Sequence, residues 1–354
     1  MSNTGKAKIG FIGAGWWATT NHMPVLASRG DVEMTAVCRL GADELQQVKQ
    51  RFGFKHATEN YREMLDADLD AVVVSTPHSM HFEHALAAIE RGMHVMCEKP
   101  LTTNAAEARH LVDAAEKQGV HLLVPYGWHY ATFVQDARRR MVDGAVGEIE
   151  FVMCHMASPI RNLLEGKRFL SDGGGEGQVM FEPASATWAD PTIAGGGYGL
   201  AQMSHSAGMA SWLTELRAKS VSALTSAPTS AVELYDAFSV EFTSGAIGSF
   251  SGAGNMPEDT GFQLNLRIFG SEGVMSIDCD RARLAVQRHD GNHFEMDLER
   301  GAGEYRGGGP PANFADLVTG KTDTNFAPGW AGMAAIEIID AAYRSVKSGQ
   351  RENV

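Results

Sequence analysis

The first 125 residues alternate between short apolar runs and longer amphipathic stretches. The stretches 81–91 and 105–117 repeat Ala, Leu and Ile at three- and four-residue spacing, which predicts helices that bury one face. Short runs that are almost wholly apolar are typical of strands buried on both sides of a parallel sheet. This half therefore predicts an α/β arrangement with helices on both faces of a parallel sheet. Its predicted strands are 9–12, 34–38, 71–75, 94–97 and 122–124.

The pattern changes after residue 145, where apolar and polar residues alternate along short segments separated by turns such as 270–273. Alternation of this kind predicts strands with one buried face. Helical periodicity is limited to 198–213 and 332–348. We therefore predict a large, mainly antiparallel open sheet, whose uncovered face is a candidate surface for dimerisation. Its predicted strands are 148–155, 220–225, 238–242, 246–250, 263–269 and 274–277.

The length of 354 residues predicts two domains, at about 150 residues per domain. We place the boundary near residue 130, which gives domains 1–130 and 131–354. The C-terminal helix at 332–348 is a candidate to pack back onto the first domain. The segment 157–195 is rich in Gly, Pro and Ser and has no clear period. Loops of this length in compact proteins are usually functional or mobile.

Composition and charge narrow the class of protein. Hydrophobic residues make up 44% and charged residues 21%, which is typical of a packed globular protein. The net charge is −13 without a basic cluster, which argues against binding to nucleic acid or to an anionic membrane. No apolar run approaches the roughly 20 residues that a membrane-spanning helix needs, and the polar residues 1–8 lack the apolar core of a secretion signal. Four scattered cysteines indicate reduced thiols, so we expect a soluble, cytoplasmic protein.

The first predicted strand runs into the pattern G-x-G-x-x-A. Gly13 allows a tight turn, Gly15 leaves room for a pyrophosphate, and the small Ala18 lets the next helix pack close to the strand. The amides at the start of that helix then face the phosphates. Trp16 and Trp17 lie in the same loop and are predicted to contact the nucleotide. The position of the pattern, at the opening of a βαβ unit, predicts a dinucleotide site.

The end of the second predicted strand bears on the choice of cofactor. A site for NAD usually places Asp or Glu there to bind the ribose 2′-hydroxyl. This chain has Arg39, whose guanidinium attracts a 2′-phosphate and can bond it with two donors. We therefore predict NADP. The alternative is that Arg39 faces solvent or stacks on adenine while NAD binds.

Several further motifs occur along most of the chain, and with them the sequence resembles the Gfo/Idh/MocA oxidoreductases. The resemblance implies an N-terminal Rossmann domain, a C-terminal α/β domain with a large open sheet, a nicotinamide cofactor, and a homodimer or homotetramer. It also implies substrates that are mostly sugars, cyclic polyols or related alcohols. The motifs are the Gly13-Ala14-Gly15 turn, His22-Met23-Pro24-Val25-Leu26, Thr76-Pro77 with His81, Glu98-Lys99-Pro100, Gly195-Gly196-Gly197 with His205, and Phe269-Gly270-Ser271-Glu272-Gly273.

The resemblance places Lys99 in the active site. Hydride transfer from an alcohol needs a positive group beside the developing alkoxide. Lys99 comes just after the predicted strand 94–97, and open α/β sheets bind ligands beyond the carboxyl ends of their strands. Pro100 restricts the residue before it to extended geometry and can hold Lys99 towards the cleft. We expect the loops after the third and fourth predicted strands to contact the cofactor. The residues concerned are Thr76, Pro77, His78, His81, Glu98 and Lys99.

His205 is the candidate acid/base, because an imidazole with a pKa near 6.5 exchanges protons at neutral pH. In many relatives an Asp lies four residues earlier and pairs with this histidine, but here that position is Ala201. Gln202 shares the same helix face and can hydrogen-bond substrate, although it cannot take up a proton. The details of the proton relay therefore stay open, and with them the substrate class.

Aromatic residues after the fifth predicted strand are expected to reach the same cleft. Rings of this kind suit the apolar face of a sugar while their polar tips offer hydrogen bonds. Tyr126, Trp128 and His129 are the candidates, with His129 as a second possible acid/base. A core position at the domain hinge is an equal alternative for Trp128. Arg161 is a candidate clamp for an acidic substrate, although a surface arginine is the default for it and for Arg168.

Two other patterns are weaker signals. His78, His81 and His84 are spaced by three, but no Cys or carboxylate lies at a ligand-like spacing, so we predict no metal site. The glycine triplets 173–175 and 307–309 follow no strand and open no amphipathic helix, so we expect flexible loops there.

The leading hypothesis is an NADP-preferring oxidoreductase that moves a hydride between nicotinamide and a hydroxyl or keto group of a sugar, cyclic polyol or related cyclic alcohol. One alternative is a redox-neutral relative that keeps NAD(P) bound and cleaves a glycosidic or similar bond. Another is a sensor without catalytic activity, which the intact Glu98-Lys99-Pro100 and His205 argue against.

Overall fold

The computed structural model describes residues 5–169 and 179–354. Its first sheet has six parallel strands in the order β3-β2-β1-β4-β5-β6. This is the strand order of a dinucleotide-binding Rossmann sheet. All strands are parallel, and the order in which they follow one another across the sheet reverses between β1 and β4. The predicted parallel sheet is confirmed, and each of the five predicted strands is present. The strands are β1 (Ala7–Ile12), β2 (Val32–Cys38), β3 (His56–Thr58), β4 (Ala71–Val74), β5 (His94–Cys97) and β6 (Leu122–Leu123).

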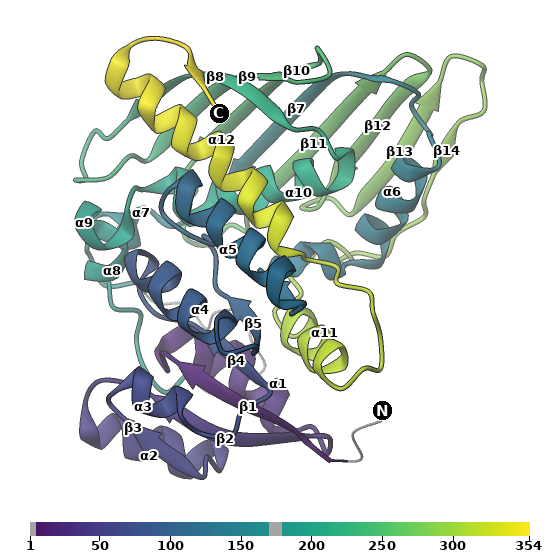
Figure 1. Cartoon of the computed structure of the whole chain (residues 1–354). Coiled ribbons are helices and arrows are strands. Elements are labelled where there is room, and N and C mark those ends of the chain that lie inside the picture. Colours follow the sequence, from purple (N-terminus) through teal and green to yellow (C-terminus); the bar gives the residue numbers. More distant parts are fainter. Residues whose placement is uncertain (1–4, 170–178) are drawn as a thin grey trace.

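Helices cover the first sheet, as its buried strands require (Figure 1). The helix α5 (Ala105–Gln118) shows how local sequence sets the ends: the Asn104 side chain accepts a hydrogen bond from the Glu107 amide, and Gly119 ends the helix in a left-handed conformation. The other helices of this half are α1 (Met23–Ala27), α2 (Ala42–Phe52), α3 (Tyr61–Leu65) and α4 (His81–Ile89), with a π-helical turn η1 (Ala18–His22) before α1 and a 3₁₀ turn η2 (His78–Met80) before α4.

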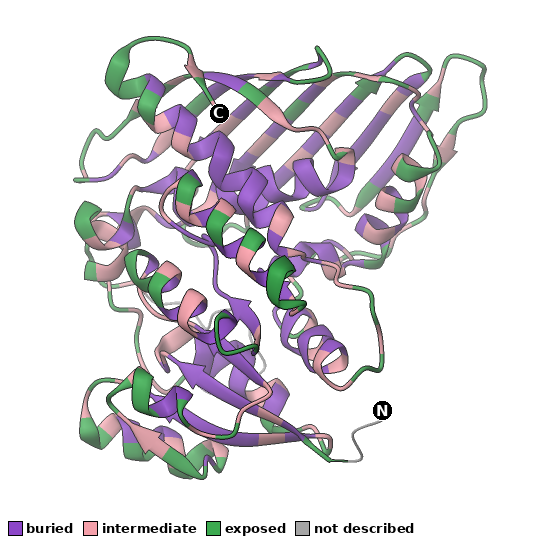
Figure 2. Cartoon of the chain, in the orientation of Figure 1, coloured by how far each residue is buried: buried purple, intermediate pink, exposed green. Residues whose placement is uncertain are grey.

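The second sheet has nine strands in the order β14-β13-β12-β11-β7-β10-β9-β8-β15. Only the β7–β10 pair is parallel, so the prediction of a mainly antiparallel sheet is confirmed. Burial alternates along most of these strands, because α10 and α12 pack against one face while the other stays open (Figure 2). The strands are β7 (Ile149–Ala157), β8 (Ala218–Ser226), β9 (Tyr235–Phe242), β10 (Ile247–Ala253), β11 (Gln263–Gly270), β12 (Gly273–Asp278), β13 (Arg283–Arg288), β14 (Phe294–Glu295) and β15 (Glu352–Asn353).

Helix prediction in the second half was incomplete. The helix α11 (Gly309–Val318) begins at Gly309, so the prediction that this triplet opens no helix is wrong. Two prolines follow Gly309, and proline in the first helical turn is preorganised for the helix, which periodicity does not report. The triplet 173–175 lies outside the described residues. The remaining helices are η3 (Gly127–Tyr130), α6 (Thr132–Val142), α7 (Arg161–Leu164), α8 (Ala186–Ala189), α9 (Pro191–Ala194), η4 (Gly199–Met203), α10 (Ser204–Thr214) and α12 (Gly329–Ser348).

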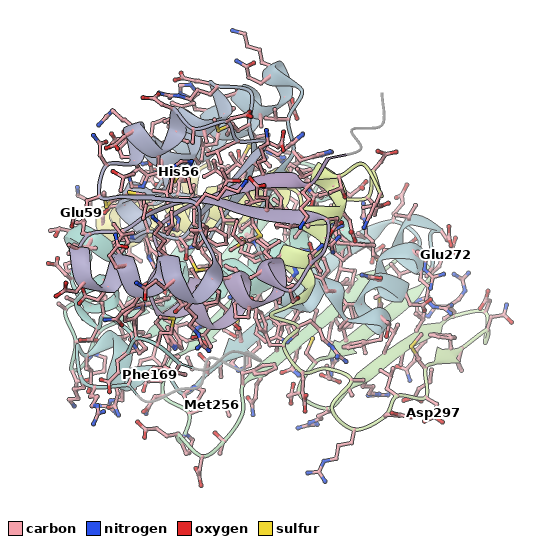
Figure 3. The ribbon with its side chains drawn as sticks, turned by 90° about the horizontal axis from the view of Figure 1, so that it is seen from below. His56, Glu59, Phe169, Met256, Glu272 and Asp297 are labelled. Atoms are coloured by element: carbon pink, nitrogen blue, oxygen red, sulfur yellow. The ribbon has the colours of Figure 1, made fainter. Side chains whose placement is uncertain are left out.

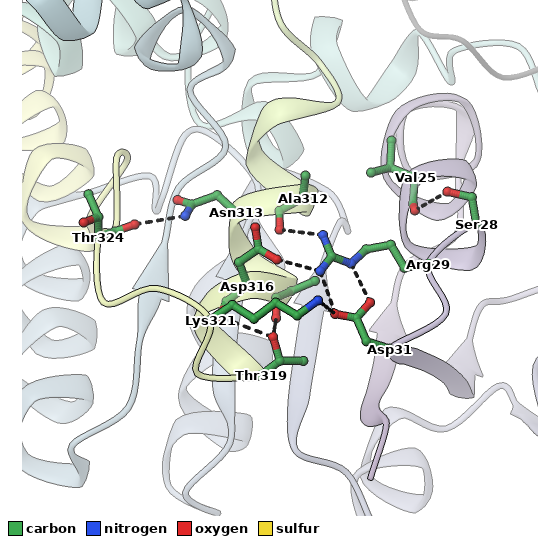
Figure 4. A network of polar contacts seen from close by, with 11 residues as sticks. Val25, Ser28, Arg29, Asp31, Ala312, Asn313, Asp316, Thr319, Lys321 and Thr324 are labelled. Atoms are coloured by element: carbon green, nitrogen blue, oxygen red, sulfur yellow. Dashed lines mark hydrogen bonds and ion pairs between the residues drawn. The ribbon is translucent and has the colours of Figure 1, made fainter. Parts of the chain in front are cut away.

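Helices from the C-terminal third bind the two halves together. The long helix α12 packs against both β8 and α5, and Glu337 on it accepts hydrogen bonds from Arg109 at 2.7 Å and from Arg217 at 2.8 Å (Figure 1). A second connection lies at α11, where Arg29 donates to Asp316 at 2.6 Å and to the Ala312 carbonyl at 3.3 Å (Figure 4). These contacts attach the second half to α5 and to the loop between α1 and β2.

Candidate active site

A cavity of about 930 Å³ lies at the carboxyl ends of the first sheet, where open α/β sheets bind ligands. Its wall combines the loops after β1, β2, β4 and β5 with residues from the second half. Glu59 and Phe169, which come from the two halves, both line it and lie on the same side of the molecule in Figure 3. The predicted site residues that line the cavity are Gly13, Gly15, Trp16, Trp17, Arg39, Thr76, Pro77, His78, His81, Glu98, Lys99, Trp128, Gln202 and His205.

The two glycines of the first loop have different local environments. Gly13 has φ of +90°, and a Cβ there would lie 2.3 Å from the Ser75 carbonyl oxygen, so only glycine fits without strain. A Cβ on Gly15 would meet nothing within 4 Å, which leaves open space in front of the loop. The turn that begins at Ala18 follows directly. A tight glycine turn with open space in front of it and a helical turn behind it is the geometry that a bound pyrophosphate needs.

Arg39 directly follows β2 and contacts the Gly13–Gly15 loop. Its Nη1 donates to the Ala14 carbonyl at 2.7 Å, and its guanidinium carbon lies 4.1 Å from the centre of the Phe181 ring. Among the described residues, its buried Nε and the buried Trp16 Nε1 have no hydrogen-bond partner. Two unpaired donors on residues that line the cavity fit a ligand that presents acceptor oxygens.

Histidines connect the loops after β4 and β5. The ring nitrogens of His81 lie 2.7 Å from the Pro100 carbonyl oxygen and 2.8 Å from that of Thr76. His78 Nδ1 lies 3.0 Å from the Ala194 carbonyl oxygen, and burial lowers the pKa of His78 to about 3. These histidines therefore position backbone segments around the cavity. Within 5–169 and 179–354, His, Cys, Asp and Glu form no cluster able to hold a metal ion.

Lys99 is buried where the halves meet. Its Nζ donates to the Ala201 carbonyl at 2.9 Å and lies 5.2 Å from the centre of the Trp188 ring. Burial lowers the pKa of Lys99 to about 8, although the charge of Glu98 acts in the opposite direction. The ammonium form therefore predominates at neutral pH, with a proton that is easier to remove than that of a surface lysine.

Glu98 keeps a negative charge next to this ammonium. Burial raises its pKa, but the hydrogen bond from His22 and the neighbouring charges lower it overall. His22 Nε2 lies 2.5 Å from one carboxylate oxygen of Glu98, and the Lys99 amide donates to the other at 3.0 Å. In the sequence His22 belongs to the motif His22-Met23-Pro24-Val25-Leu26, which by itself predicts no role for the side chain. The structure shows that it holds the Glu98 carboxylate.

His205 lies in the first turn of the buried helix α10, after the π-helical turn η4. Rings surround it, with centroids at 5.4 Å for Tyr126, 5.2 Å for Trp128 and 5.7 Å for Tyr305. Burial, reinforced by the charge of Lys99, lowers the pKa of His205 well below 6.5, so the ring is neutral at pH 7. Its buried Nδ1 has no partner in the described part of the chain. Aromatic packing therefore orients this histidine, since Ala201 offers no carboxylate.

Three predicted substrate residues lie outside the cavity lining. Tyr126 is buried behind His205. His129 stacks on Trp212 with ring centroids 4.5 Å apart, its Nδ1 lies 2.9 Å from the Phe326 carbonyl oxygen, and burial lowers its pKa to about 4. Arg161 forms an ion pair with Glu165, with 2.7 Å between Nε and Oε1. The structure gives His129 a packing role and places the Arg161 side chain away from Lys99 and His205.

Three aromatic residues that the sequence did not predict, Phe262, Tyr305 and Trp188, complete the wall around His205 and Lys99. Trp128 packs against Phe262 at 4.6 Å and Tyr305 at 4.7 Å, and its Nε1 donates to the Gly303 carbonyl at 3.2 Å. Trp188 lies beside Lys99. Phe262 and Tyr305 come from irregular segments and Trp188 from the four-residue helix α8, all too short or irregular for periodicity to carry a signal. Their aromatic character within glycine-rich stretches was the available clue.

Comparison with known proteins assigns both halves. Residues 7–126 match the family model for an oxidoreductase family with an NAD-binding Rossmann fold. Residues 134–276 match the model for the GFO/IDH/MocA C-terminal domain. In the part of the chain that the structure describes, no helix is long and apolar enough to cross a membrane.

Curated relatives align over part of their length. D-glucoside 3-dehydrogenase of Escherichia coli is 34% identical over 143 residues, which is 40% of this chain and 41% of that protein. Glucose-6-phosphate 3-dehydrogenase of Bacillus subtilis is 30% identical over 162 residues, 46% of this chain and 45% of that protein. The chain thus matches less than half the length of these relatives.

Solved structures match over nearly the whole chain. An oxidoreductase domain protein from Kribbella flavida superposes with a TM-score of 0.81 at 21% identity, over 99% of this chain and 100% of that one. Levoglucosan dehydrogenase in complex with NADH and levoglucosan has a TM-score of 0.77 at 20% identity, over 99% of each chain. These likenesses establish the fold. Because both halves match its domain models, the chain belongs to the Gfo/Idh/MocA family of oxidoreductases.

Proposed function

We propose that the protein is an NAD(P)-dependent oxidoreductase, which transfers a hydride between nicotinamide and a hydroxyl or keto group of a sugar, cyclic polyol or related cyclic alcohol. One observation carries this proposal: an ammonium, Lys99, and a neutral imidazole, His205, line the same cavity as the Gly13–Gly15 loop. Relatives named as sugar dehydrogenases support a redox reaction over the bond-cleaving alternative.

The residues around the first loop fit a dinucleotide. Gly15 leaves space for a pyrophosphate, and the unpaired donors of Trp16 and Arg39 suit its acceptor oxygens or those of its ribose. Once bound, nicotinamide supplies or accepts the hydride. The protein's own task is then to position the alcohol, to move one proton and to stabilise one oxyanion.

His205 and Lys99 divide this task. In the oxidative direction the neutral His205 takes the hydroxyl proton, and its low pKa keeps it available as a base across the neutral range. The Lys99 ammonium stabilises the oxyanion that develops on the same oxygen. The Ala201 carbonyl fixes Lys99 Nζ beforehand, so no reorganisation is needed during the reaction. Gln202 lines the same wall and can orient a second hydroxyl.

Within this proposal we assign NADP as the preferred cofactor. Arg39 borders the cavity and its guanidinium is held by Ala14 and Phe181, with donors left over for a 2′-phosphate. Glu59 also lines this end, and its carboxylate accepts a hydrogen bond from the Gly41 amide at 2.7 Å. The proposal of NADP therefore rests on the remaining guanidinium donors of Arg39, which suit a 2′-phosphate.

We further propose a homodimer or homotetramer formed through the open face of the second sheet. The cross-strand register aligns Ile247, Phe151, Phe269 and Val274 in one row over β10, β7, β11 and β12. Ile247 and Phe269 are exposed, and an exposed apolar row on a sheet marks an association surface.

We also propose that the protein is cytoplasmic. Its four cysteines are buried free thiols, and the reducing cytoplasm keeps thiols in this state.

The deciding experiment follows nicotinamide absorbance with both cofactors over a panel of sugars, inositols, anhydrosugars and cyclic diols. We expect at least one compound to be oxidised at a rate that depends on Lys99. Tight cofactor binding without turnover of any alcohol or ketone in the panel contradicts the proposal.

A further inference from the structure

The wall around the reacting groups is strongly aromatic. Trp128, Tyr305 and Phe262 form one continuous cluster against His205, and Trp188 borders Lys99 on the other side. All four line the cavity. Trp128 is held in place by its hydrogen bond to the Gly303 carbonyl, so its ring is a fixed surface. Fixed ring faces and edges favour a ligand that offers apolar C–H groups.

Positive charge is scarce at this wall. Among the described residues that line the cavity, the only Lys and Arg side chains are Lys99 and Arg39. Arg39 contacts the first loop at the cofactor end and is bound to Ala14. Lys99 is bound to Ala201 and lies next to the ionised Glu98. In the proposed reaction Arg39 binds the cofactor and Lys99 faces the reacting oxygen, so neither is left for an anionic group elsewhere on the substrate.

The arginines of the segment after β7 do not change this balance. Arg161 pairs with Glu165, and Arg168 pairs with Glu182. Residues 170–178, which lie outside the described structure, contain Asp172 and Glu176 but neither Lys nor Arg in the sequence. In the described part of this segment both arginines are thus paired, and neither lines the cavity.

Trp188 belongs to this segment, which meets the cofactor half at three aromatic contacts. The ring centroids of Phe169 and Trp16 lie 6.5 Å apart, and those of Trp188 and His78 lie 5.0 Å apart. The ring of Phe181 lies against the Arg39 guanidinium. Of these, only Trp188 also contacts Lys99. Trp188 is therefore placed to touch the part of the substrate next to the reacting carbon.

We propose that the substrate is an uncharged cyclic alcohol with an apolar face, bound between the Trp128 cluster and Trp188, and that Trp188 is a specificity residue. This inference rests on the proposed oxidoreductase function. A phosphate or carboxylate in this position needs a bidentate arginine or a free ammonium to offset its desolvation. An anhydro or deoxy sugar, or a glycoside with an apolar aglycone, needs only ring contacts and one or two hydrogen bonds.

The test compares matched compounds on the purified full chain with saturating cofactor. Glucose is measured against glucose 6-phosphate and glucuronate, and against 1,5-anhydroglucitol and phenyl β-glucoside. We expect kcat/KM for the uncharged compounds to exceed that for the charged ones by about 100-fold, and to be highest where an apolar group replaces a hydroxyl. A charged compound that equals its uncharged parent overturns the inference.

Variants of Trp188 test the residue itself. Trp188→Ala should lower kcat/KM for the best uncharged substrate about tenfold, mainly through KM, and Trp188→Phe should restore part of the loss. Trp188 contacts His78 and Lys99, so cofactor Kd is measured in the same variants and should change less than KM does. Trp330→Ala removes an indole that does not line the cavity and serves as the control. Unchanged KM in Trp188→Ala removes this residue from specificity.

Failure of the oxidoreductase proposal gives a different result. If no compound in the panel is turned over, that proposal fails, and calorimetric titration of the same compounds into the cofactor-loaded protein still tests the substrate class. Tighter binding of glucose 6-phosphate than of glucose, or no binding of any uncharged compound, overturns the inference. Tighter binding of 1,5-anhydroglucitol or of the phenyl glucoside supports it.

Discussion

Lys99 Nζ donates a hydrogen bond of 2.9 Å to the backbone carbonyl of Ala201, 102 residues further along the chain. This bond joins the loop after β5 to the π-helical turn η4, and so connects the two halves at a lysine that lines the cavity. It also gives Ala201 a role that its side chain does not suggest. Ala201 thus contributes an oxygen from its backbone, directed towards the lysine.

Removing the ammonium tests its part in the proposed reaction. Lys99→Ala should lower kcat about 100- to 1,000-fold, because the oxyanion loses its preorganised partner. Cofactor Kd, measured by fluorescence titration, should change less than about threefold. Lys167→Ala, at an exposed lysine paired with Glu165, is the control. Turnover of Lys99→Ala near the wild-type rate excludes this lysine from the mechanism.

The pH profile of alcohol oxidation should have its alkaline limb near pH 8. Lys99 acts as a cation, and its pKa of about 8 means that activity is lost as pH rises through that value. Lys99→Arg should remove this limb while lowering the maximum, since arginine stays charged. The acid side should stay flat to well below pH 6.5, because His205 is protonated only at lower pH.

Glu98→Gln provides a second test of the same limb. The Glu98 charge raises the pKa of Lys99, so its removal should move the alkaline limb below pH 8. The measurement is kcat/KM against pH with saturating cofactor. A limb that stays at pH 8 in both Glu98→Gln and Lys99→Arg belongs to another group.

Arg39 should set the choice between the two cofactors. Arg39→Asp should raise the Kd of NADP about 100-fold and change that of NAD far less, because a carboxylate repels the 2′-phosphate. The ratio of the two Kd values is the measured quantity. An unchanged ratio shows that Arg39 has no contact with the 2′-phosphate and favours stacking on adenine.

The two glycines of the first loop should respond differently to the same change. Gly13→Ala forces a Cβ against the Ser75 carbonyl at positive φ and should destabilise the fold by about 2 kcal/mol or more. Gly15→Ala meets open space and should keep the wild-type Tm while weakening cofactor binding. Thermal unfolding and cofactor titration on both variants separate the effects. Equal Tm for the two variants contradicts this assignment.

The apolar row on the open sheet face should control assembly. Ile247→Arg places a charge at the β10 end of that row, at its most exposed position, and should shift the protein to monomer in analytical ultracentrifugation. Its Tm as a monomer depends on how much stability the interface contributes. Val142→Arg, at an exposed position on α6, is the matched control and should leave assembly unchanged. Wild-type assembly of Ile247→Arg shows that the contact lies elsewhere.

The sequence by itself determined the parallel sheet, the open antiparallel sheet and the dinucleotide loop. It also identified Lys99 and His205, which the structure places at one cavity. These features are local, because a buried strand, a tight glycine turn or a charged motif is specified within about ten residues of chain.

Only the tertiary structure decided how these parts meet. The Ala201 carbonyl, the His22–Glu98 pair and the ring cluster around His205 each join segments far apart in the sequence. It also turned Arg161 towards Glu165 and brought Trp188 to Lys99. Periodicity reports which side of an element is buried, whereas the packing of irregular segments depends on contacts between distant residues, which no local pattern encodes.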